Sequence, residues 1–134
     1  MISQGPSALS HIRNIDYTVL FARDLQAMRH FYERVMGFPL TRTLSDRWFE
    51  YQLGATTLAL TTRGGRFDDP PPEPGALSAQ LAFRVPPPMV AACAAELQAK
   101  GIALIAPVKD HAFGHRTIFF RDPDGNVLEI YAEI

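Results

Sequence analysis

The pattern of apolar and polar positions repeats itself once along the chain. Residues 15–22 are rich in β-branched and aromatic side chains, which predicts a strand. Asp24 follows at the N-cap position of a helix, and Gly37 stands where that helix should end. Between them, apolar residues recur every three or four positions and form one helical face: Leu25, Met28, Phe31, Tyr32, Val35 and Met36.

The second half of the chain repeats this order. Residues 77–85 read as a strand, and three consecutive prolines block its continuation. An apolar helical stripe follows and ends at Gly101; its members are Val90, Cys93, Ala94 and Leu97. Tyr17 corresponds to Gln80 in this repeat, and the glycine turns at Gly54 and Gly125 each lead into a strand.

The repeat predicts an α+β fold of two paired βαβββ modules. The first module covers about residues 12–62 and the second residues 77–134, joined by a polar, Pro/Gly-rich linker at 63–76. Residues 1–11 are expected to be an N-terminal tail and residues 12–134 one domain. A half of this size buries little apolar surface alone, so we expect the sheets to join into a curved, cup-like mixed sheet with the helices outside.

Composition narrows the possible partners. The 134 residues suffice for one domain, and 47% of them are hydrophobic, as in a globular protein. Thirteen basic and fourteen acidic residues give a net charge of −1 with no run of either sign, which argues against nucleic acid or a membrane surface as partner. One cysteine, no leader-like start and no long apolar run lead us to expect a cytoplasmic protein.

Strand alternation places one carboxylate on the inner face of the predicted cup. In the last strand Leu128 and Ile130 should pack under a helix, which leaves Glu129 on the other face, where it needs a partner. Counting from the two glycine turns makes Leu58 the counterpart of Glu129. We therefore expect four side chains to converge near the axis that relates the modules: Tyr17, Leu58, Gln80 and Glu129.

Several motifs resemble the glyoxalase/bleomycin-resistance/extradiol-dioxygenase group, the vicinal oxygen chelate superfamily. They are Asp16-Tyr-Thr-Val-Leu-Phe-Ala-Arg-Asp-Leu25, the Phe31-Tyr32 to Gly37-Phe38 helix ending, Leu81-Ala-Phe-Arg-Val85 and Phe120-Arg-Asp-Pro-Asp-Gly-Asn-Val-Leu-Glu129. The match extends from about residue 12 to residue 134. The resemblance implies paired βαβββ modules, frequent homodimers, and a cup in which a divalent metal can chelate two adjacent substrate oxygens.

The resemblance also implies where metal ligands would lie. Members that use a metal commonly offer His or Gln from the first strand of each module and Glu from the last strand. Those positions are Tyr17, Gln80 and Glu129 here, with Leu58 at an optional fourth. A phenol must lose its proton to bind a metal strongly, an amide oxygen is a weak ligand, and leucine cannot ligate.

Three interpretations follow. In the first, which we predict, no cofactor is bound and the cup holds a small organic ligand, as in antibiotic-sequestering members. In the second, Gln80 and Glu129 hold a divalent metal (Mg, Mn, Zn, Ni or Fe) for a lyase, isomerase or ring-cleaving dioxygenase. If the protein is an enzyme, Glu129 is the expected base or ligand and Tyr17 a proton donor. In the third, the polar side chains only hydrogen-bond one another.

Aromatic residues are the candidates for the ligand-binding walls. These are Trp48, Phe113, Phe119 and Tyr131, together with Tyr17, Leu58 and Gln80 from the inner face. His111 and His115 are either a base or gate at the mouth of the cup or solvated loop residues. The acidic spacing of Asp122-Pro-Asp-Gly-Asn126 imitates a calcium loop, but a tight Asp-Gly turn explains it better.

Overall fold

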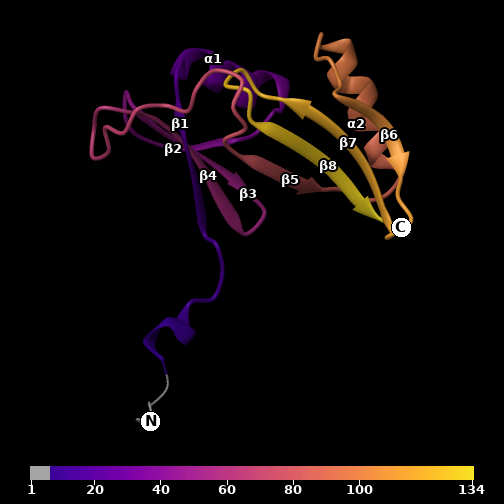
Figure 1. Cartoon of the computed structure of the whole chain (residues 1–134), viewed down its shortest axis with the longest axis horizontal. Coiled ribbons are helices and arrows are strands. Elements are labelled where there is room, and N and C mark those ends of the chain that lie inside the picture. Colours follow the sequence, from indigo (N-terminus) through magenta and orange to yellow (C-terminus); the bar gives the residue numbers. More distant parts are fainter. Residues whose placement is uncertain (1–6) are drawn as a thin grey trace.

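Two four-stranded sheets of identical strand order, each with one helical segment, make up the computed structural model (Figure 1). The structure describes residues 7–134. A short 3-10 helix, η1 (Ala8–His11), precedes the first module, whose elements are β1 (Tyr17–Ala22), α1 (Leu25–His30), the π-helical segment η2 (Phe31–Val35), β2 (Leu40–Ser45), β3 (Trp48–Leu53) and β4 (Thr56–Thr62). The second module contains β5 (Gln80–Arg84), α2 (Met89–Ala99), β6 (Ala106–Asp110), β7 (His115–Arg121) and β8 (Val127–Glu133).

The strand orders are β1-β4-β3-β2 and β5-β8-β7-β6. In each sheet the first and last strands pair in parallel and the remaining neighbours are antiparallel. The predicted α+β class and the paired βαβββ modules are confirmed. Within the described residues the two sheets remain separate, with no strand pairing between them.

Helix α1 begins and its continuation ends at the predicted residues. The Asp24 side chain accepts a hydrogen bond from the Ala27 amide at 3.1 Å, which satisfies a free donor of the first turn. Gly37 has a φ of +68°, the left-handed conformation that favours glycine after a helix. Sequence periodicity predicted one uniform helix, whereas the structure changes to π-helical geometry from Phe31 onwards.

Strand alternation gives each sheet one helix-covered face and one open face, the face that carries no helix. In β8 the side chains of Leu128, Ile130 and Ala132 are buried on the side of α2, as predicted. In β3 Phe49 and Tyr51 are buried on the side of α1 and η2, opposite Trp48. The open faces therefore carry the candidate functional side chains.

Contacts from η2 join the two modules. The Tyr32 hydroxyl donates to Asp122 Oδ2 at 2.7 Å, and the Phe31 and Phe120 rings lie 6.4 Å apart. Burial, followed by the charge of Asp122, raises the pKa of Tyr32. Asp122 also accepts the amides of Asp124 and Asn126, both at 3.0 Å, so this segment is a tight turn, as the sequence favoured over a calcium loop.

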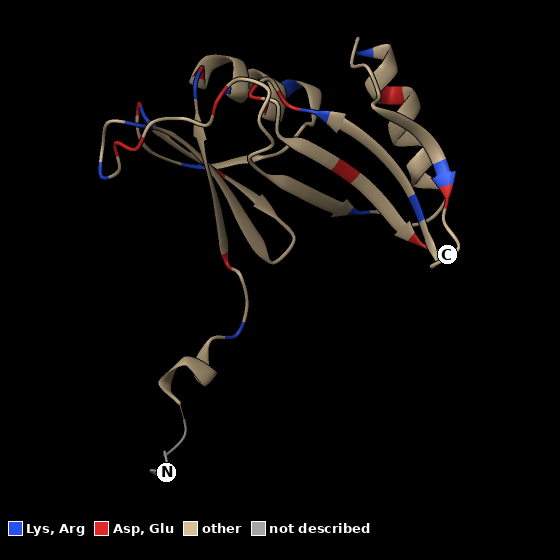
Figure 2. Cartoon of the chain, in the orientation of Figure 1, with Lys and Arg blue, Asp and Glu red and all other residues tan. Residues whose placement is uncertain are grey.

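An N-terminal segment, here called the arm (residues 7–16), extends away from the first module (Figure 1). Its apolar side chains Leu9, Ile12 and Ile15 are each more than 70% exposed. The predicted tail, residues 1–11, lies partly outside the described residues. Acidic and basic residues are interspersed over both modules (Figure 2). In residues 7–134 every helix is too short or too polar to cross a membrane.

Candidate functional site

Gln80 and Glu129 lie together on the open face of the second sheet. They belong to the neighbouring strands β5 and β8, and the Gln80 side-chain amide donates to Glu129 Oε1 at 3.2 Å. Gln80 is exposed and Glu129 is half-buried. The structure thus brings these two predicted side chains into contact where a ligand can reach them.

Aromatic side chains continue this open face towards the edge of the module. Phe119 stands directly opposite Glu129 in the β7–β8 ladder. The His115 ring stacks on Tyr131 with centroids 4.8 Å apart, and Phe113 contacts both His115 and His111 at 5.1 Å. Phe113 is 73% exposed. These rings form a wall beside Glu129, in which the two histidines are packed against aromatic residues.

The open face of the first sheet carries a second carboxylate, Glu50 of β3. Its Oε2 accepts the indole N–H of Trp48 at 2.7 Å, and its Oε1 accepts the Tyr17 hydroxyl at 3.2 Å. The residue is only 5% exposed. Sequence reasoning missed Glu50, although strand alternation from Trp48 places it on the same face.

Leu58 does not lie on the open face, so its prediction was wrong. The ladder pairs Tyr17 with Thr57 and Gln80 with Val127, which makes Ala59 the structural counterpart of Glu129. Leu58 is one residue out of step and is buried on the helix-covered face, 2% exposed. A one-residue shift in a strand moves a side chain to the opposite face.

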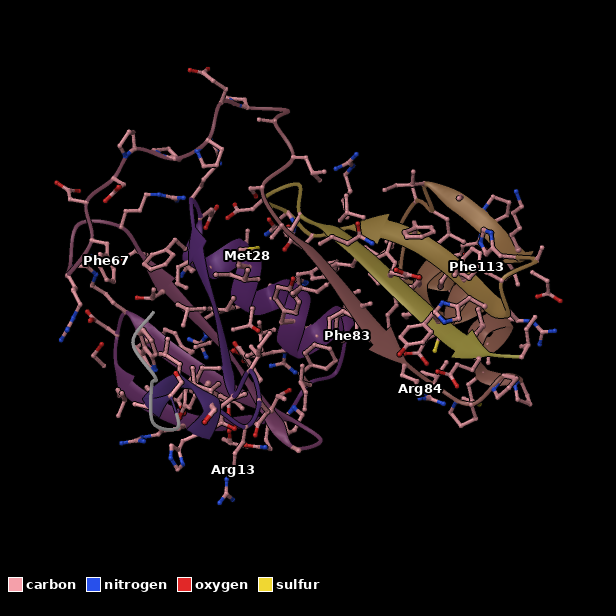
Figure 3. All side chains as sticks on the ribbon, turned by 60° about the horizontal axis from the view of Figure 1, so that its bottom comes forward. Arg13, Met28, Phe67, Phe83, Arg84 and Phe113 are labelled. Carbon is pink, nitrogen blue, oxygen red and sulfur yellow. The ribbon has the colours of Figure 1, made fainter. Side chains whose placement is uncertain are left out.

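The predicted cluster of four side chains is instead two separate pairs. Tyr17 bonds Glu50 in the first sheet, and Gln80 bonds Glu129 in the second. Figure 3 shows the two modules side by side, with Phe67 on the loop that follows β4 at one end of the molecule and Phe113 in the second module at the opposite end. Each open face therefore carries one carboxylate that accepts hydrogen bonds from neutral donors of its own sheet, two at Glu50 and one at Glu129.

A pocket of about 710 Å³ lies on the first module beside Trp48. Strands β1, β2, β3 and β4 and the loop after β4 contribute to its walls. The apolar members are Val19, Phe21, Leu44, Trp48 and Phe67. Its size falls within the range of pockets that bind small molecules.

Comparison with known proteins gives the family. The family model of the Glyoxalase/Bleomycin resistance protein/Dioxygenase superfamily matches residues 14–130. The chain belongs to this superfamily.

Individual members of the superfamily are similar over most of the chain. Virulence protein STM3117 of Salmonella typhimurium is 34% identical over 122 residues, covering 89% of this chain and 83% of that protein. Its crystal structure aligns with a TM-score of 0.72 and 29% identity over 92% of this chain and 98% of that chain. A glyoxalase/bleomycin resistance protein/dioxygenase from Nocardioides has the same fold, with a TM-score of 0.79 and 22% identity over 92% of this chain and 85% of the other.

Superfamily membership raises the question of how the side chains at the expected ligand positions compare with good transition-metal ligands. The positions expected to supply ligands carry Tyr17, Gln80 and Glu129. The Tyr17 hydroxyl donates to Glu50 Oε1, and the Gln80 amide donates to Glu129 Oε1. A phenol hydroxyl and a side-chain amide are weaker transition-metal ligands than imidazole. Within residues 7–134, no three His, Cys, Asp or Glu side chains are grouped to hold a metal ion.

Cys93 of α2 adds no reactive group. It is half-buried, and burial followed by the charge of Glu96 raises the pKa of its thiol. A thiol with a raised pKa forms less of the nucleophilic thiolate. The candidate chemistry of the chain therefore rests on the two open faces.

Proposed function

We propose that this protein binds and sequesters a small organic molecule on its open sheet faces without a transition metal. The observation that carries the proposal is the state of the expected metal positions: Tyr17 and Gln80 each donate to a carboxylate of their own sheet. Hydrogen-bonded carboxylates beside aromatic walls suit an organic ligand with polar groups, because they orient it while the rings supply contact area.

The ligand-binding residues of this proposal come from both open faces. Tyr17, Trp48 and Glu50 serve the first open face. Gln80, Glu129, Phe119, Tyr131 and Phe113 serve the second. Glu129 is the residue on which we base the test, because it is half-buried and, within residues 7–134, its side chain accepts one hydrogen bond, from Gln80.

The proposal includes a homodimer in the cytoplasm. Two features support a second copy: each module leaves one sheet face open, and the arm exposes three large apolar side chains. Exposed apolar groups that follow one another on an ordered segment are typical of an interaction surface. The single cysteine fits a reducing compartment.

Ligand binding is tested by a thermal-shift screen of antibiotics, catechols and thiol adducts on the intact chain. A compound that stabilises the protein is then titrated against Glu129→Gln and against a control, Glu73→Gln, whose side chain is exposed on the linker. We expect at least about a fivefold loss of affinity in Glu129→Gln and none in the control, about 1 kcal/mol for one weakened hydrogen bond. Unchanged affinity in Glu129→Gln would show that the Gln80–Glu129 pair only stabilises the fold and does not bind the ligand.

Metal dependence is tested separately by elemental analysis of the purified protein, followed by titration with Zn, Mn, Ni and Fe(II). The proposal expects no stoichiometric metal and no binding at micromolar concentrations. One metal per chain, bound at micromolar affinity or tighter and lost in Glu129→Ala, would overturn the metal-free function and favour a metal-dependent lyase, isomerase or dioxygenase.

A further inference from the structure

The pocket beside Trp48 combines apolar walls with positive charge. Phe21, Trp48 and Phe67 supply aromatic surface, and the rings of Phe21 and Phe67 meet edge to face at 6.2 Å. Phe67 and Leu44 are both more than half exposed, so the apolar surface is accessible. The two charged side chains among the described lining residues are Arg47 and Arg66.

Arg47 is held in place by neutral groups. Its Nε donates to Thr62 Oγ1 at 2.8 Å and its Nη2 donates to the carbonyl oxygen of Arg63 at 2.8 Å. Its own carbonyl oxygen accepts the Thr61 hydroxyl at 2.6 Å. A guanidinium has five N–H donors, so these bonds fix its position and leave donors for an anion.

Trp48, which also lines the pocket, is likewise held by a hydrogen bond. Its indole N–H bonds Glu50, which is not itself among the residues that line the pocket. The indole of Trp48 thus lines the pocket and is anchored by a buried carboxylate. A wall and a charge that are both positioned before binding lower the entropic cost of capturing a ligand.

We infer that this pocket selects organic anions, namely molecules with an aromatic or aliphatic body and a single carboxylate-like group that Arg47 binds. The inference rests on the proposed small-molecule function and names the chemical class of the ligand. The apolar body fills the space between Phe21, Trp48 and Phe67. The anionic group faces Arg47, with Arg66 adding charge at the same pocket.

Three matched probes test the charge selectivity: phenylhexanoate, phenylhexanol and phenylhexylamine. Trp48 is the only tryptophan of the chain, so quenching of its fluorescence reports binding in this pocket directly. We expect the carboxylate to bind at least about tenfold tighter than the alcohol, and the amine to bind more weakly than either, because a charge-assisted hydrogen bond to arginine is worth about that factor. Equal affinities, or tightest binding of the amine, would overturn the inference.

Arg47→Gln should lower the affinity for phenylhexanoate to that for phenylhexanol. The affinity for phenylhexanol should stay unchanged, and this result would show that the pocket is intact. Arg47→Lys keeps the charge and should retain part of the selectivity. The control Arg34→Gln removes an exposed arginine of η2 and should change neither affinity. Full carboxylate selectivity in Arg47→Gln would contradict the role of Arg47.

The outcomes separate this inference from the proposed function. If none of the three probes shows the expected selectivity but a screened compound binds in a manner that depends on Glu129, the anion selectivity is wrong and the proposed function stands. If neither the probes nor any screened compound binds, both are wrong.

Discussion

Glu50 and Tyr51 are neighbours on β3 whose side chains point to opposite faces of the first sheet. Glu50 accepts hydrogen bonds from two neutral donors on the open face, Tyr17 and Trp48. Tyr51 is fully buried and donates to Glu33 of η2 at 2.6 Å on the helix-covered face. Adjacent residues thus hold separate hydrogen-bond groups on the two faces of the sheet.

The Glu33 carboxylate makes the stability of the fold depend on pH. Burial acts to raise the pKa of Glu33, but the hydrogen bonds from Tyr51 and Arg29 outweigh it and lower that pKa below its usual value of 4.5. A lowered folded-state pKa contributes stability above the unfolded pKa, and the contribution is lost as pH falls through the folded pKa.

We therefore predict that Tyr51→Phe lowers the free energy of unfolding by about 1–2 kcal/mol near neutral pH, the usual contribution of a hydrogen bond to a charged group. The loss should shrink as the pH falls through the lowered pKa of Glu33, because protonation removes the charge that strengthens the hydrogen bond. Urea denaturation of both proteins near pH 7 and near pH 3 measures the difference. Tyr131→Phe deletes a hydroxyl that bonds no carboxylate among the described residues, and its effect should not change with pH. An equal loss for Tyr51→Phe at both pH values would contradict the prediction.

Among single residues, the sequence predicted one of the two carboxylates on the open faces, Glu129, and missed the other, Glu50. Glu129 was predictable because buried leucine and isoleucine flank it in its own strand. Glu50 was not predictable, because its strand carries aromatic residues on both faces. Alternation alone therefore does not indicate that this carboxylate is buried. Its burial depends on Tyr17, which is distant in sequence and adjacent only after folding.

Among the elements, the strands and helices were predictable but their exact register was not. Leu58 was assigned by counting from Gly54, as Glu129 was counted from Gly125. The strand pairings show that Thr57 and Val127 are the equivalent residues. The segment from Gly54 to Thr57 is therefore one residue longer than the segment from Gly125 to Val127. Turn length is set by backbone geometry that an apolar pattern does not record, and a single residue reverses the face.

The ending of the first helical segment gives a test at the scale of one element. Gly37 has a φ of +68°, and a Cβ added there would meet no atom within 4 Å. The cost of Gly37→Ala therefore comes from backbone strain alone, and we expect a loss of about 1–2 kcal/mol in the free energy of unfolding.

Gly65→Ala is the matched control for this prediction, measured in the same urea denaturation. Gly65 does not have a positive φ, and an added Cβ would make an ordinary contact with Arg47 at 4.0 Å. That substitution should be neutral or slightly stabilising, because it restricts the unfolded chain. Equal effects of the two substitutions would show that the left-handed conformation at Gly37 is not required.

Across the whole molecule, the duplication predicted the paired modules correctly, and the structure adds that no strand pairing connects their sheets within the described residues. The internal repeat fixes the order of elements, and that order is what the two sheets share. The expectation that the sheets merge came from the small core of each half. The structure links the modules through η2, with Tyr32 bonded to Asp122, and leaves both open faces outside that junction.

The arm provides the test of assembly. Leu9, Ile12 and Ile15 are exposed at three-residue spacing, and burying each against a second copy would contribute about 1.5–3 kcal/mol. We predict that the full chain sediments as a dimer and that replacing all three with serine raises the dimer dissociation constant by at least about tenfold. Leu77→Ser, which changes an exposed leucine outside the arm, should leave the dimer intact. Analytical ultracentrifugation over a range of concentrations distinguishes the outcomes. A dimer that the triple substitution does not weaken would exclude the arm from the interface. A monomeric full chain would contradict the homodimer itself, and each open face would then have to bind its ligand within a single copy.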